Sequence, residues 1–216
     1  MHTDAARDEH RGQALVEFGL TLPLLLVILL GVADLGRVFQ AGIVMESAAR
    51  AAAEAAALEY VRDQPPDPSE PDYATFNSTT YYQRLHELAA QAACEEARIL
   101  TNTTYDSANR DCTTGGSGDQ WPVVLACVHD DDPTTGRPGD PLCGDPIAGY
   151  ASSHADCDRT DGGWTNTPDI QGHFYVEVRV CYRFTTLFSV TLPMATGITV
   201  GEVILQKDAH FSVADY

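Results

Sequence analysis

Basic residues are scarce in this sequence of 216 residues. It has 13 Lys and Arg against 31 Asp and Glu, which gives a formal net charge of -18 at pH 7. The electrostatic field of a protein with this negative charge repels phosphate backbones and anionic lipid headgroups. The composition therefore argues against nucleic acid as a partner.

Charge is almost absent from one block near the N-terminus. Residues 14–33 read ALVEFGLTLPLLLVILLGVA, in which Glu17 is the single ionisable group. A block of this length spans a hydrocarbon core of about 30 Å. We therefore predict a transmembrane helix here. A cleaved secretory signal peptide is the alternative, but the block is long for one and no A-x-A site directly follows it.

Cysteine is absent before and within this block. All six cysteines follow it: Cys94, Cys112, Cys127, Cys143, Cys157 and Cys181. An even set in a loop-rich region favours disulfides, and hence an oxidising compartment. We predict a single-pass membrane protein with its first dozen residues in the cytoplasm and its large C-terminal part outside. The pairing of the six cysteines stays open.

Proline is absent from Asp34 to Arg62, and the alanine-rich sequence there has high helix propensity. One helix of about 50 residues, roughly 75 Å long, is therefore predicted from the apolar block onward. The predicted organisation is a leader at residues 1–12, a helix at 13–63 that is transmembrane over 14–33, a proline-rich linker at 64–80 and an extracytoplasmic domain at 81–216.

The extracytoplasmic domain begins with a predicted helix, Tyr81 to about Leu100. Its expected apolar face is Tyr81, Leu85, Leu88, Ala92 and Ile99. Residues 101–172 hold ten glycines, six prolines and four cysteines, and only one short apolar run, Val123 to Ala126. We expect this stretch to be a loop-rich acidic insertion braced by disulfides.

A clear strand pattern follows the insertion. In HFYVEVRVCYRF, apolar side chains from Phe174 to Phe184 alternate with a second set that includes Cys181. A second strand, Ile198 to about Leu205, is expected to pair with it antiparallel. The predicted fold class is α+β, with one long N-terminal membrane-spanning helix packed on a small antiparallel sheet.

Gly12 precedes the apolar block. Glu17 follows this glycine by five residues, and the aromatic residue Phe18 follows it by six. The segment RGQALVEFGLTLPLLLVILLGVADLGR resembles the opening of the TadE-like family of tight-adherence (Flp-type) pilus proteins. The resemblance implies cutting by a membrane prepilin peptidase after Gly12. Gln13 would then become the N-terminus, with Glu17 and Phe18 as the fifth and sixth mature residues.

A second part of the resemblance lies at the end of the apolar block. Asp34, Gly36 and Arg37 resemble the D-x-G-R segment that closes the family's hydrophobic stretch. The family relation implies a pilin-like fold and a non-enzymatic role as a pseudopilin or minor pilin. It also implies that the helix joins other pilin subunits in the membrane and that the protein reaches the cell surface or the pilus.

Glu17 supports this interpretation on physical grounds. A carboxylate at the centre of a bilayer costs about 2.5 to 3.5 kcal/mol, and less toward the interface. Cleavage would place a positive amine on Gln13, four residues and roughly 6 Å of helix rise away. The amine of a neighbouring subunit would neutralise the acid during assembly. The alternative is that Glu17 simply reaches the headgroup region.

The alanines after the apolar block allow two explanations. Ala48, Ala52 and Ala56 have the small-x-x-x-small spacing that lets two helices approach closely in a bundle. Ala49, Ala53 and Ala57 repeat it. Packing within the domain, where alanine is also the best helix former, explains the same pattern.

Metal binding has weaker support. Acidic loops outside the cell suit calcium, with candidate ligands Asp130, Asp131, Asp132, Asp156, Asp158 and Asp161, but the EF-hand spacing fails. Cys127 with His129, and His154 with Cys157, would form a Cys2His2 zinc site if the thiols were free. We expect disulfides instead, and no cofactor.

No nucleophile motif supports catalysis. Ser152, Ser153 and His154 lie near several aspartates, but without a recognisable catalytic context. The sequence is also compatible with two functions other than that of a pilin. One is a signal-anchored surface protein whose acidic, disulfide-braced domain binds calcium or another ligand, and the other is a membrane-tethered hydrolase.

Overall fold

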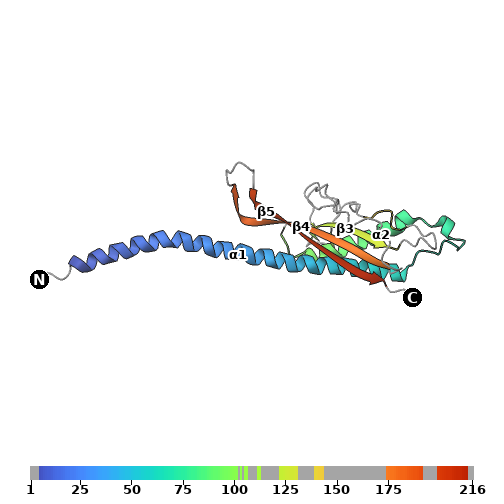
Figure 1. Cartoon of the computed structure of the whole chain (residues 1–216), viewed down its shortest axis with the longest axis horizontal. Coiled ribbons are helices and arrows are strands. Elements are labelled where there is room, and N and C mark those ends of the chain that lie inside the picture. Colours follow the sequence, from blue (N-terminus) through green and yellow to red (C-terminus); the bar gives the residue numbers. More distant parts are fainter. Residues whose placement is uncertain are drawn as a thin grey trace. The chain divides into compact units, whose positions relative to one another are not determined.

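The computed structural model describes residues 5–101, 103, 105–106, 111–112, 122–130, 139–143, 174–191 and 199–213. The chain divides into two compact units, residues 1–40 and 41–216, and the boundary falls within one helix. The helices are α1 (Ala5–Arg62), the short 3-10 helix η1 (Tyr73–Thr75) and α2 (Ser78–Ala97) (Figure 1). The strands are β1 (Tyr105–Asp106), β2 (Asp111–Cys112), β3 (Val123–His129), β4 (Phe174–Thr191) and β5 (Thr199–Val213).

Helix α1 supplies everything that is described of the first unit. It begins at Ala5 rather than at Gln13, and it continues through Pro23. All side chains from Gln13 to Ala33 are exposed. Among the described residues, α1 is the helix whose length and composition suit a membrane span. The predicted long apolar helix is confirmed.

In the second unit, α1 buries one broad face made mainly of alanine. Its buried residues recur every three or four positions, which places them on one side of the helix. They are Ala41, Met45, Ala48, Ala49, Ala52, Ala53, Ala56, Ala57 and Tyr60, each at most 2% exposed. Side chains this small let the backbone of a neighbouring element approach closely.

Helix α2 packs antiparallel to this part of α1. Ser47 Oγ donates to Glu96 Oε2 over 3.2 Å near one end. At the other end, the Arg84 guanidinium lies 2.5 Å from Glu59 Oε1. Asn77 caps the start of α2, because its side-chain oxygen accepts a hydrogen bond from the Thr80 backbone N–H. The helix therefore begins at Ser78, three residues before the predicted start.

The predicted apolar face of α2 is largely wrong. Leu85 is buried as expected, but Ile99 lies beyond the helix and is 61% exposed, and Tyr81, Leu88 and Ala92 are only partly buried. The buried residues are Tyr82, Leu85, His86, Ala89, Ala90, Ala93, Cys94 and Ala97. The side of α2 that carries the alanines is buried because small side chains allow close packing. Tyr82 and His86 are buried with it because their polar groups form hydrogen bonds with Asp130 and Asp140.

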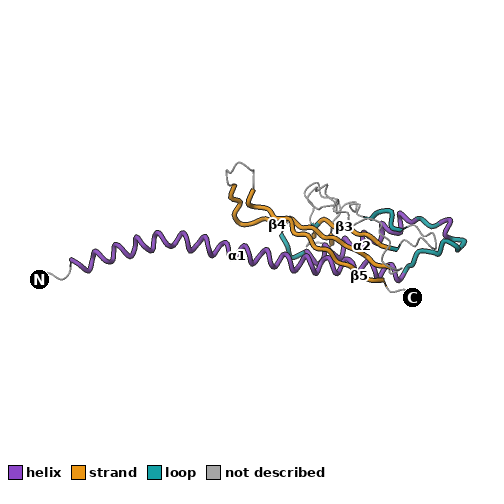
Figure 2. Tube along the Cα trace, in the orientation of Figure 1, coloured by secondary structure: helices purple, strands orange, loops and turns teal. Residues whose placement is uncertain are grey.

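The main sheet is antiparallel, in the order β3-β4-β5, and a separate two-stranded sheet pairs β1 with β2. Strands β4 and β5 run side by side from Phe174↔Val213 to Thr191↔Thr199, with one irregularity between Thr185 and Val190 (Figure 2). Strand β3 pairs with the first part of β4, from Val123↔Cys181 to His129↔Tyr175. The sheet therefore has three strands along part of its length and two beyond Cys181.

The two faces of the sheet differ in chemistry. Cross-strand register places Val124, Ala126 and Val128 of β3 on one face with Val176, Val178 and Val180 of β4. All six are buried, and α2 contacts β3. The opposite face carries Cys127 and His129 of β3 with Glu177, Arg179 and Cys181 of β4.

The antiparallel strand pair is confirmed, but both strands are longer than the alternating pattern indicated. Strand β5 has 15 residues and reaches Val213, well beyond Leu205. The prediction that the whole stretch 101–172 is loop-rich is wrong for Val123–His129, which form strand β3. All seven of its residues are buried, so its sequence, VVLACVH, shows no alternation of polar and apolar side chains.

Buried polar contacts hold α2 to the end of β3. Tyr82 Oη donates to Asp130 Oδ2 over 2.5 Å. Burial, reinforced by the Asp130 carboxylate, raises the pKa of Tyr82 far above its usual value, so the phenol stays protonated and able to donate. One turn along, His86 Nε2 lies 2.6 Å from Asp140 Oδ2.

Asp140 joins three segments of the chain. Besides its contact with His86 on α2, its Oδ2 accepts from the Val128 backbone N–H over 3.0 Å and its Oδ1 from that of Leu142 over 2.8 Å. The carboxylate is almost fully buried. Next to it, the Cys127–Cys143 disulfide closes a sequence separation of 16 residues, which corresponds to about 3 kcal/mol in the chain-entropy description.

Replacing Asp140 by alanine tests this arrangement. Asp140→Ala leaves His86 and two backbone N–H groups without their acceptor, and we expect a loss of about 3 kcal/mol in the free energy of unfolding. The melting temperature should then fall by about 6 to 12 °C. Asp72→Ala, at an exposed aspartate, is the control and should change stability by less than about 0.5 kcal/mol. Equal melting temperatures for the two variants would contradict the role of Asp140.

Candidate functional site on the N-terminal helix

The four residues of the predicted processing motif all lie within α1. Gly12, Gln13, Glu17 and Phe18 follow one another on a continuous helix, and the side chains of the last three are exposed. Phe18 is 59% exposed. No other part of the chain that the structure describes covers the segment from Gln13 to Phe18, so its side chains are open to the surroundings of the helix.

Glu17 has no partner within its own chain, as far as the structure is described. The Thr21 hydroxyl donates to the backbone carbonyls of Glu17 and Phe18, over 3.0 and 3.2 Å, and not to the carboxylate. Among the described residues, the Glu17 carboxylate takes part in no ion pair. A compensating charge for this acid therefore has to come from outside the described part of the chain.

The D-x-G-R segment forms a local ion pair. Arg37 Nη1 lies 3.1 Å from Asp34 Oδ1, three residues earlier on the helix. Gly36 stands between them, and a Cβ added there would meet no atom within 4 Å. The same holds for Gly19, Gly31 and Gly42. Glycine costs a helix about 0.8 to 1.0 kcal/mol relative to alanine, and packing against the described residues does not explain these four.

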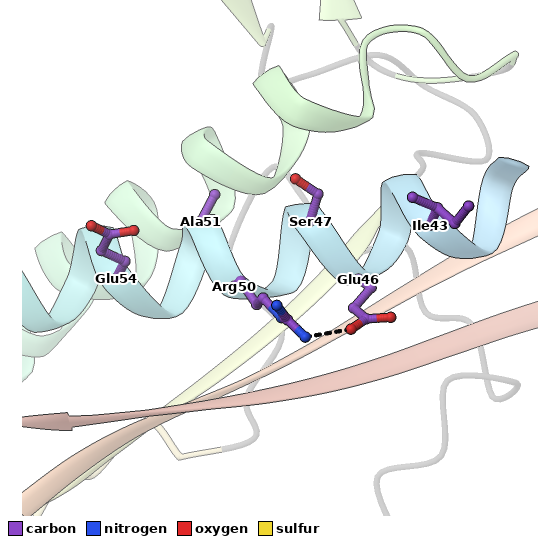
Figure 3. A pocket seen from close by; sticks show the side chains of 6 residues that line it. All are labelled: Ile43, Glu46, Ser47, Arg50, Ala51 and Glu54. Carbon is purple, nitrogen blue, oxygen red and sulfur yellow. Dashed lines mark hydrogen bonds and ion pairs between the residues drawn. The ribbon is translucent and has the colours of Figure 1, made fainter.

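A shallow groove of about 410 Å³ lies along the part of α1 that belongs to the second unit. Its lining residues are Ile43, Glu46, Ser47, Arg50, Ala51 and Glu54 (Figure 3). The Arg50 guanidinium pairs with Glu46 over 2.5 Å, as the dashed line marks. Ile43 at the end of the groove is 71% exposed. The sequence interpretation missed this surface, although its spacing of three and four residues signals one helix face.

The two alanine series lie on the buried face of α1 and do not line the groove. Ala48, Ala52 and Ala56, and equally Ala49, Ala53 and Ala57, are at most 1% exposed within the single chain. Intrachain packing therefore uses all six. The close approach of helices that their spacing predicts takes place within the chain, where α2 packs along this part of α1.

Cysteine chemistry agrees with the disulfide interpretation. Cys127 is bonded to Cys143, and Cys94 and Cys181 are also disulfide-bonded. Cys181 lies on the polar face of the sheet, opposite the row that includes Val178 and Val180, as its place in the alternating pattern predicted. The side chains of Cys112 and Cys157 lie outside the described residues.

The Cys2His2 zinc hypothesis is wrong, because the Cys127 sulfur is taken by its disulfide. His129 instead contacts Glu177. Of the calcium candidates, Asp130 is fully buried and accepts the hydrogen bond of Tyr82, which occupies one of its oxygens. The other five, Asp131, Asp132, Asp156, Asp158 and Asp161, lie outside the described residues, as do Ser152, Ser153 and His154.

Comparison with known proteins gives one match. Residues 12–54 match the family described as TadE-like protein. No curated protein and no solved structure matches the chain. The match spans 43 of the 216 residues, from the predicted last leader residue to the last residue of the groove on α1. It confirms the resemblance on which the sequence interpretation was based, because residues 12–54 are similar to the TadE-like family.

Proposed function

We propose that this chain is a TadE-like minor pilin, anchored in the membrane by α1 and associated with the subunits of a tight-adherence pilus. The observation that carries the proposal is the family match over residues 12–54, which coincides with the apolar, exposed part of α1 and its continuation along the groove. The role is structural rather than enzymatic.

The proposal includes processing by a prepilin peptidase between Gly12 and Gln13. The family match begins at Gly12 itself. A glycine lets the peptide backbone approach an enzyme closely because it has no Cβ. Cleavage would free an amine four residues before Glu17, and this amine on a neighbouring subunit is the proposed partner of the Glu17 carboxylate.

The disulfides support an extracytoplasmic position for the second unit. Cys94, Cys127, Cys143 and Cys181 are all disulfide-bonded, and all lie beyond the apolar part of α1. Disulfides persist in oxidising compartments and are rare in the cytoplasm. We therefore place the leader in the cytoplasm and the domain on the outer side of the membrane, at the cell surface or in the pilus.

The groove on α1 is the proposed contact surface for pilus subunits outside the bilayer. It is lined by residues of the TadE-like segment beyond the apolar span, whereas the alanine face beside it is buried within the chain. Ile43 offers an apolar anchor at one end, and the Glu46–Arg50 pair offers charges of both signs.

Processing is tested by Gly12→Leu. The new side chain should obstruct the backbone at the peptidase, so the precursor accumulates with its first 12 residues attached. N-terminal sequencing and intact mass distinguish it from the wild type, which should begin at Gln13. Gly31→Leu, the same change within the apolar span, is the control and should be processed normally. A wild-type protein that retains Met1, or an unchanged N-terminus for Gly12→Leu, contradicts the cut site.

Glu17→Gln separates assembly from processing. Removing the charge should leave membrane insertion intact or improve it. Recovery of the protein with sheared pili should nevertheless fall about tenfold, as expected for a lost interaction of about 1.4 kcal/mol. Glu87→Gln, at an exposed acid of α2, is the control. Normal recovery of a correctly processed Glu17→Gln protein would contradict the pairing of Glu17 with a neighbouring amine. It would favour the explanation that Glu17 reaches the headgroup region.

Ile43→Arg tests the groove. Since Ile43 is 71% exposed, the substitution should leave the melting temperature within about 1 °C while recovery with sheared pili falls. Leu58→Arg is the matched control, because Leu58 is 60% exposed on the same helix but lies outside the groove and beyond residue 54. Equal recovery of the two variants would exclude the groove as a subunit contact.

A further inference from the structure

The far end of the β4–β5 pair differs from the rest of the domain in its charge. Between Arg183 and Glu202 the sequence has no Asp, Glu, Lys, Arg or His, although 20% of the chain is charged. The two strands pair here over residues 184–191 of β4 and 199–203 of β5, and we call this part of the sheet the arm. Its one charged residue is Glu202, at its base.

The arm has two strands, whereas the sheet beside it has three. The pairing of β3 with β4 ends at Cys181, and no further strand pairs with the arm in the described part of the chain. The irregularity between Thr185 and Val190 lies within the arm, where Figure 1 shows the strands bending. Thr186 Oγ1 donates there to the Gly201 carbonyl oxygen over 3.3 Å. A two-stranded ribbon alone is marginally stable in water, so the arm has a physical reason to rest on another surface.

The apolar row of β5 is open at both of its ends. Val203, in the arm, is 44% exposed, and Phe211, near the other end, is 40% exposed. Their direct cross-strand partners on β4 are Phe184 and Val176, which are at most 4% exposed. The two open ends are alike in exposure, so their place in the domain decides what each of them meets.

The arm lies at the end of the domain where α1 enters it. Helix α2 runs antiparallel to α1, and Ser47 contacts Glu96 near the last turn of α2. Just beyond that turn, Thr101 Oγ1 lies 3.2 Å from Tyr182 Oη, at the point where β4 continues into the arm. Strand β5 ends beside the start of β4, so Phe211 lies at the opposite end of the domain.

Only a short segment joins this end of the domain to the apolar block. Helix α1 is continuous from Ala33 to Ala41, where the second unit begins. The rise of the helix over this segment is about 12 Å. The part of the domain that carries the arm is therefore tethered closely to the part of α1 that suits a membrane span.

The chemistry of the arm suits the headgroup region of a bilayer rather than its core. The outer edges of the arm carry backbone N–H and C=O groups that no other described strand satisfies, and such groups are strongly disfavoured in hydrocarbon. The headgroup region holds water, which pairs with them. The formal net charge of -18 repels anionic headgroups from the chain as a whole. The uncharged stretch of the arm approaches zwitterionic headgroups without that penalty.

We propose that the arm rests on the bilayer that α1 crosses, at the level of the lipid headgroups, with Val203 in contact with a zwitterionic lipid surface. A second contact beside α1 would fix the orientation of the domain on the membrane, which a single helix leaves free to rotate. The inference rests on the anchoring of α1 in the membrane, which belongs to the proposed function. It depends neither on cleavage nor on the association with pilus subunits.

The experiment measures the quenching of tryptophan fluorescence by phosphatidylcholine that is brominated near the headgroup end of its acyl chains. The full-length, disulfide-bonded chain is reconstituted at a high ratio of lipid to protein, so that a vesicle holds a single chain. Val203→Trp places the probe in the arm. Phe211→Trp is the matched control, on the same face of the same strand and almost equally exposed. The wild type, with Trp121 and Trp164, gives the background.

The two probes should respond differently. We expect the bromines to remove about half of the fluorescence that Val203→Trp adds, because its ring lies at the membrane interface, and almost none of the fluorescence that Phe211→Trp adds. Both sites are exposed, so both variants should keep the melting temperature of the wild type. Equal quenching of the two probes overturns the inference.

Leu24→Trp separates a failure of this inference from a failure of the membrane anchor. Leu24 is 63% exposed in the apolar block, so bromines deep in the acyl chains should quench its probe. If they do and Val203→Trp is quenched no more than Phe211→Trp, the inference is overturned while the anchor stands. If Leu24→Trp is not quenched, both are overturned. A probe at position 203 that is shielded from water only when many chains share a vesicle would identify a second copy as the occupant, which also overturns the inference.

Discussion

The structure depends on one constraint: helix α1 must suit two different environments along a single run of residues. From Gln13 to Ala33 its side chains are large, apolar and exposed, as a hydrocarbon solvent requires. From Ala41 to Tyr60 one face is reduced to alanine, with Met45 and Tyr60 as exceptions, and is buried. The change from leucine to alanine along α1 separates an exposed apolar surface, of the length and composition that suit a membrane span, from a surface for close packing.

The alanine face has a cost that the rest of the domain must offset. Alanine buries little apolar area, so packing on α1 alone contributes little hydrophobic stabilisation. The domain compensates with a continuous row of buried valines on the sheet and with polar contacts that are fully enclosed, such as Tyr82 with Asp130 and His86 with Asp140. Disulfides add to this by restricting the unfolded chain.

Much of the fold followed from periodicity. The apolar block, the proline-free continuation and the alternating strand from Phe174 to Phe184 gave α1 and the core of β4, because each pattern is long and has one clear period. The D-x-G-R segment was also identified, and the structure shows Asp34 and Arg37 paired. These features depend on local sequence, which a single chain displays directly.

The features that were missed depend on tertiary context. Strand β3 is buried on both faces, so its residues do not alternate, and the glycines and prolines around it indicated a loop. The buried face of α2 turns toward its alanines because α1 approaches there closely, and no periodicity distinguishes that side from the side of Leu88 and Ile99. The contacts of His129 and His210 with Glu177 join three strands far apart in sequence, and only the register brings these residues together.

The division between the matched segment and the rest of the chain has a physical basis. The TadE-like match ends at residue 54, while the buried face of α1 continues to Tyr60 and the sheet, α2 and disulfides all lie beyond. The matched segment is the exposed apolar part of α1 together with its continuation along the groove. A domain that packs only on its own alanine face is constrained only to complement that face. The polar contacts of the sheet, such as those of Glu177 with His129 and His210, therefore belong to the part of the chain that the family match does not cover.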